Sequence, residues 1–79
     1  MRRPSNLHLP FNEEEVTRAL NHLCSMPKFA HVTLKTKDLR EFLLRTMGGK
    51  LMAHGKMWEV VSKSLGAGVY RVSLKSDAS

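Results

Sequence analysis

The chain of 79 residues has room for one domain with a single hydrophobic core. Apolar residues make up 42% of it and charged residues 25%, which is typical of a globular protein and excludes a disordered or fibrous chain. Thirteen lysines and arginines against seven aspartates and glutamates give a formal net charge of +6, so the composition favours a polyanionic partner.

The cysteine content predicts an intracellular environment. Cys24 is the only cysteine, so the chain cannot form an intrachain disulfide and must be held by packing, as expected of a cytoplasmic or nucleoid-associated protein. The segment after Arg2 and Arg3 contains two prolines and lacks the apolar region of a signal peptide. No stretch approaches the roughly eighteen apolar residues that span a bilayer, so no membrane partner is expected.

The first regular element is predicted to be a helix that begins at residue 12 or 13. Asn12 is a favourable N-cap, and Glu15 follows three residues later, as in a capping box. Apolar residues then recur with the helical period until Pro27, which ends the helix near residue 26. These periodic positions are Val16, Ala19, Leu20, Leu23 and Cys24.

A strand and a second helix are expected next. The segment 29–34 is short, rich in β-forming residues and alternates apolar with polar side chains, which predicts a strand. A helix is predicted over residues 37–47, with Thr36 as its cap and Gly48 and Gly49 at its end, because glycine accepts a positive φ. The apolar positions of this helix are Leu39, Phe42, Leu43 and Met47.

The remainder is predicted to form a third helix and a second strand. The helix begins at Lys50 or Lys56 and ends at Leu65, since apolar residues recur there at helical spacing. The strand covers residues 69–74, where apolar and polar side chains alternate, and it can pair with the first strand. The predicted fold class is therefore α+β, with three helices and a minimal two-stranded antiparallel sheet in the order α-β-α-α-β.

This order of elements over residues 12–75 resembles the winged-helix form of the helix-turn-helix DNA-binding domains. The resemblance implies an extended basic arm over residues 1–10, one winged-helix-like domain over 11–75 and a polar tail over 76–79. It also implies that the third helix enters the major groove of DNA. This chain departs from the family pattern because only one strand is visible after that helix and the Gly48–Gly49 turn is longer.

The resemblance implies a small DNA-binding regulator or recombination accessory factor, of the sort that phages and plasmids carry, acting as a homodimer. Basic residues near the predicted second and third helices are candidate phosphate ligands, and the two N-terminal arginines are candidates for a minor-groove arm. For each lysine singly, a solvated helix face is an equally good interpretation. The predicted DNA-binding residues are Arg2, Arg3, Lys35, Thr36, Lys37, Lys50, His54, Lys56, Lys63 and Arg71.

The alternative is a protein-interaction module, such as an inhibitor that docks on a larger nucleic-acid-processing protein. An exposed apolar patch of Leu51, Met52 and Trp58 would favour this alternative, whereas a continuous basic face with these residues buried would favour DNA. RNA binding ranks third, because the predicted strands offer only Phe29 and Tyr70 for base stacking.

No cofactor, metal site or enzymatic activity is expected. His22 and Cys24 are two residues apart on a helix, so they point to different sides, unlike metal ligands at i and i+4. The sequence contains no C-x-x-C pair, no paired catalytic carboxylates and no nucleophile elbow.

Overall fold

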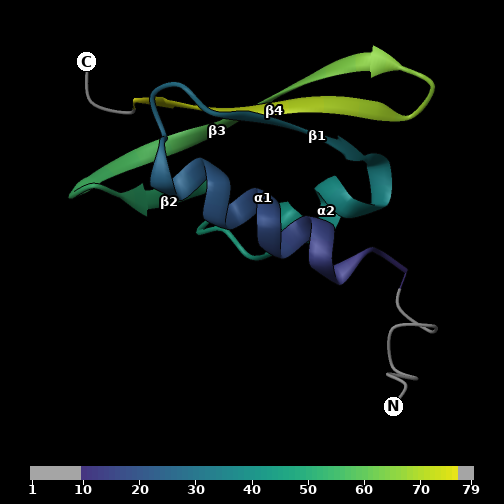
Figure 1. The fold of residues 1–79 in the computed structure, drawn as a ribbon, viewed down its shortest axis with the longest axis horizontal. Helices are drawn as coiled ribbons and strands as arrows, with labels where there is room; N and C mark the ends of the chain where they lie inside the picture. The colour runs from purple at the N-terminus through teal and green to yellow at the C-terminus, as the bar shows by residue number, and fades with distance from the viewer. Residues whose placement is uncertain (1–9, 77–79) are drawn as a thin grey trace.

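The computed structural model describes residues 10–76, which form one layer of two helices against a four-stranded antiparallel sheet (Figure 1). The predicted arm, apart from Pro10, and the last three residues of the predicted tail lie outside the described residues. The sheet order is β1-β4-β3-β2. The elements are α1 (Glu13–Ser25), β1 (His31–Lys35), α2 (Thr36–Leu44), β2 (Lys50–Ala53), β3 (Lys56–Gly66) and β4 (Val69–Ser76).

The N-cap of α1 is confirmed. The side-chain oxygen of Asn12 accepts a hydrogen bond from the backbone N–H of Glu15 at 3.2 Å. The reciprocal half of the capping box is absent, because the backbone N–H of Asn12 donates to Asp38 of α2 at 2.8 Å. The beginning of α1 is therefore fixed to the first turn of α2.

The second helix is shorter than predicted and has a different cap. It ends at Leu44, and its N-cap is Lys35, which makes no side-chain capping bond. The hydroxyl of Thr36 instead donates to the carbonyl of Gly68 at 3.2 Å, so it holds the turn between β3 and β4. Because the helix stops early, Met47 lies beyond it and is exposed.

The predicted third helix is wrong: residues 50–66 form β2 and β3. His54 and Gly55 connect these strands with φ values of 53° and 76°, as a type I′ turn requires at both central positions. Buried side chains alternate with exposed ones, since Leu51 and Ala53 face the core while Met52 does not. The fold remains α+β, but with two helices and four strands in place of three helices and two strands.

The predicted pairing of the first and last strands is confirmed. Val32 lies opposite Val72 and Leu34 opposite Tyr70 in antiparallel register. The last strand also pairs along its length with β3, which makes a long β hairpin closed by Gly66–Ala67–Gly68. All three turn residues have positive φ, and the ladder contains a register shift between Ser64 and Gly66.

The core lies between the helices and one face of the sheet. Trp58 is 6% exposed, and its indole N–H donates to the Ala53 carbonyl at 2.9 Å, which satisfies its polar atom. No helix within residues 10–76 is long and apolar enough to cross a membrane. The buried apolar residues are Val16, Ala19, Leu23, Ala30, Leu34, Leu39, Phe42, Leu51, Ala53, Trp58, Val72 and Leu74.

Candidate nucleic-acid interface

No element within residues 10–76 covers the face of the sheet that turns away from the helices (Figure 1). Successive side chains of a strand point to opposite faces, so the positions between the core residues share this second face. We name it the open sheet face, and none of its residues is buried. They are His31, Thr33 and Lys35 of β1, Lys50 and Met52 of β2, Met57, Glu59, Val61 and Lys63 of β3, and Val69, Arg71, Ser73 and Lys75 of β4.

Positive charge dominates this face. Glu59 lies in register with Lys75 on one side and Lys50 on the other, so its negative charge offsets these two lysines only. Further along the hairpin, Lys63 lies directly opposite Arg71. Like charges at opposite positions of a sheet are destabilising, so this pair is not explained by the stability of the fold.

The acidic side chains are concentrated on the helical layer. Three glutamates occupy the first turn of α1, where they interact favourably with the helix dipole. Arg45 donates to Glu13 at 2.8 Å and to Glu41 at 2.9 Å. No carboxylate within residues 10–76 lies within ion-pair distance of Lys63 or Arg71.

The ion pair between Arg45 and Glu13 also changes the pKa of both groups. The hydrogen bond from Arg45 lowers the pKa of Glu13 below its ordinary value. The hydrogen bonds to Glu13 and then Glu41 raise the pKa of Arg45. The guanidinium carbon of Arg45 also lies 5.5 Å from the centre of the Phe11 ring, so this cation is engaged within the fold and is not part of the open sheet face.

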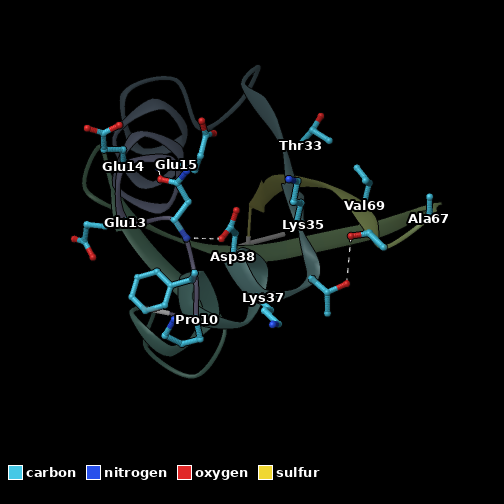
Figure 2. A pocket seen from close by; sticks show the side chains of 14 residues that line it. Pro10, Glu13, Glu14, Glu15, Thr33, Lys35, Lys37, Asp38, Ala67 and Val69 are labelled. Atoms are coloured by element: carbon cyan, nitrogen blue, oxygen red, sulfur yellow. Dashed lines mark hydrogen bonds between the residues drawn. The ribbon is translucent and has the colours of Figure 1, made fainter. Parts of the chain in front are cut away.

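A cleft separates the open sheet face from the acidic first turn of α1 (Figure 2). Thr36 and Lys37 line it from the N-terminus of α2, and Lys35 lines it from β1. Glutamates 13–15 line the same cleft from α1. Lys35 therefore lies at the border of the open sheet face, and Lys37, on α2, lies outside that face.

The other predicted DNA-binding residues are divided between the two faces. Lys50, Lys63 and Arg71 lie on the open sheet face with Lys35. Lys56 is on the helix side of its strand, with its ammonium group 5.5 Å from the centre of the Trp58 ring. His54 is exposed in the β2–β3 turn. Arg2 and Arg3 lie outside the described residues.

Two of the three residues predicted to form a partner surface are in the core. Leu51 and Trp58 are buried against the helices, because they lie opposite each other on the covered face of β2 and β3. Met52 is 56% exposed and lies opposite Met57 on the open sheet face. The three residues therefore do not form one apolar patch.

Among the lysine, arginine and histidine residues of the open sheet face, two were not predicted as site residues. Lys75 continues the alternation of Arg71 and Ser73 along β4, and extension of that period by one step would have found it. His31 lies opposite Ser73 on the edge strand β1, where its exposed position in the alternation of β1 was the available signal.

Within residues 10–76 no group of three histidine, cysteine or acidic side chains is placed to hold a metal ion. Cys24 is a free, half-buried cysteine that packs against the core. Comparisons of this chain with protein families, with curated proteins and with solved structures gave no match.

Proposed function

We propose that this protein binds double-stranded DNA with the open sheet face and the β3–β4 hairpin. The observation that carries the proposal is the pairing of Lys63 with Arg71 at opposite positions of the hairpin, with no described carboxylate in ion-pair distance. A phosphate group held between two such cations would relieve their repulsion and supply the charge that the fold lacks there.

The shape of the hairpin supports a duplex partner. The major groove of B-DNA, about 12 Å wide, admits a two-stranded β-ribbon as well as a helix. Several DNA-binding proteins read either groove with strands. In this chain the hairpin takes the place that the sequence assigned to a recognition helix, and it carries Lys63, Arg71 and Lys75 on one face.

The burial pattern also favours DNA over the alternative of an apolar partner surface. Leu51 and Trp58 are buried, while basic residues extend over β1, β4 and β3 of the open sheet face. A small DNA-binding domain with this charge is suited to a regulator of transcription or an accessory factor in recombination, which is an analogy with other small DNA-binding proteins.

The test is the affinity of the protein for a labelled duplex of random sequence, measured by fluorescence anisotropy at increasing salt. We expect the logarithm of the affinity to fall linearly with the logarithm of the salt concentration, with a slope of about −0.9 for each phosphate contacted. Lys63→Glu and Arg71→Glu should each weaken binding and reduce that slope by about one or more.

Lys37→Glu is the matched control. It changes the net charge by the same amount, but Lys37 lies in the cleft lined by the α1 glutamates, off the open sheet face. An equal loss of affinity in Lys37→Glu and Lys63→Glu would show that only overall charge matters and would remove the open sheet face from the interface. Absence of binding at low salt would contradict the proposal as a whole.

A further inference from the structure

The outer edge of β3 is only half covered by β2. The register between these strands runs from Lys56 to Glu59, and the N–H of Val60 makes one further bond, to the carbonyl of Gly49 at 2.8 Å. Beyond that point β3 continues for six residues with β4 on one side only. All six, residues 61–66, are exposed.

The backbone of this segment has groups available for another strand. Alternate residues of an antiparallel strand direct their N–H and C=O groups to opposite neighbours. Since Val60 directs its N–H towards β2, Ser62 and Ser64 direct theirs to the same side, where no described strand lies. Such an edge is a template for a further strand.

We infer that this edge binds an extended segment of a partner protein, which adds to the sheet beside β3. Charge and polarity specify the chemistry of that segment. Lys63 at the centre of the edge requires an acidic side chain opposite it, while Val61 and Leu65, which are 39% and 51% exposed, favour apolar side chains. The expected segment alternates as apolar, any residue, acidic, any residue, apolar.

Lys63 also disfavours the self-pairing register in which two copies of this chain would oppose like charges, and the mass of the protein in solution tests the other registers. Antiparallel self-pairing that joins Ser62 to Ser64 of the second copy places Lys63 opposite Lys63 of that copy. Directly opposed like charges destabilise a strand pair, and an edge lysine is a common protection against self-pairing. An acidic strand reverses the sign of this interaction.

Strand addition and the proposed DNA binding both use the side chain of Lys63, but only strand addition uses the backbone N–H of Ser62, so the two are separable at Ser62. The probe is a blocked synthetic peptide, TVTETVT, compared with TVTKTVT. We expect the glutamate peptide to shift the amide NMR resonances of Ser62 and Ser64, and to bind at least about tenfold more tightly than the lysine peptide.

Two variants decide the mechanism. Ser62→Pro removes the backbone N–H that faces the open edge, and proline is compatible with an edge position of this kind. This variant should therefore lose peptide binding and keep duplex binding. Ser62→Ala keeps the N–H and should bind the peptide normally. If circular dichroism shows that Ser62→Pro does not fold, the Lys63→Glu variant tests the inference instead. It should bind TVTKTVT more tightly than TVTETVT.

Equal affinity for the two peptides, no binding of either, or a concentration-dependent doubling of mass without peptide would overturn the inference. Persistent binding by a folded Ser62→Pro variant would do the same. A protein that binds TVTETVT but no duplex would leave the strand-addition site standing and reject the proposed function.

Discussion

Asp38 joins the two helices, because its carboxylate accepts a hydrogen bond at 2.8 Å from the backbone N–H of Asn12, 26 residues earlier in the chain. Asp38 is the buried charged residue of the described core, with 7% of its surface exposed. Asn12 in turn caps α1 with its side chain. One carboxylate therefore sets both the beginning of α1 and its position relative to α2.

Removal of this acceptor should destabilise the protein. Asp38→Ala leaves the N–H of Asn12 without its partner in a half-buried position, so we expect a loss of about 1–3 kcal/mol in the free energy of unfolding. Asp38→Asn retains an acceptor oxygen and should lose less. Urea denaturation measures both values, and equal losses would show that the negative charge, not the accepted hydrogen bond, stabilises this junction.

The Arg45–Glu13 pair should make stability depend on pH. Arg45 lowers the pKa of Glu13 in the folded protein, so the contribution of the pair is present above the unfolded pKa and is lost as the pH falls through the lowered folded value. Arg45→Gln should therefore be less stable than the parent at neutral pH, with a difference that shrinks well below the ordinary glutamate value of 4.5.

The control for this pair is Arg40→Gln, which removes an exposed arginine of α2 that forms no ion pair with a described residue. Its stability relative to the parent should not follow the titration of Glu13. Urea denaturation over a series of pH values provides the comparison, and a constant deficit for Arg45→Gln would assign its effect to the ring contact with Phe11.

The turn between β2 and β3 should respond to substitutions that fit its backbone. His54 has a φ of 53°, which asparagine adopts more readily than histidine, so His54→Asn should stabilise the hairpin by up to about 1 kcal/mol. Gly55→Ala places a Cβ at a φ of 76° and should destabilise it by about 1–2 kcal/mol. Thermal unfolding measures both changes in stability, and a stabilising effect of Gly55→Ala would contradict the assigned type of turn.

This turn also explains why the fold was only partly predictable from the sequence. The segment that became β3 contains apolar residues whose spacing fits a helical period and a strand period alike, since Val60 and Val61 are adjacent. The deciding signal is the His54–Gly55 pair, but histidine is not a typical first residue of such a turn. By contrast, Asn12 and the apolar stripe of α1 have one interpretation, and the structure confirms it.

The prediction of the site residues was affected by the same error, the assignment of β3 as a helix. Residues assigned to one helix face were divided by the strand period, which left Lys63 on the open sheet face and Lys56 on the opposite side beside Trp58. Arg71 lies in a strand that was predicted correctly in type, whereas Lys35 lies one residue beyond the predicted strand 29–34 and reaches the open sheet face because β1 extends to it. The pairing of Lys63 with Arg71 depends on the register of β3 and β4, which the sequence pattern does not specify.

Trp58 offers a test that separates the fold from the interface. Its ring is buried on the helix side of β3, so its fluorescence emission should lie at short wavelength and resist quenching by acrylamide. Trp58→Phe removes the indole N–H bond to Ala53 and some buried surface, which should lower the free energy of unfolding by about 1–2 kcal/mol. Duplex affinity should be unchanged in the folded variant, because the ring and the open sheet face lie on opposite sides of the sheet. A large loss of affinity without unfolding would place Trp58 in the interface and would contradict binding through the open sheet face.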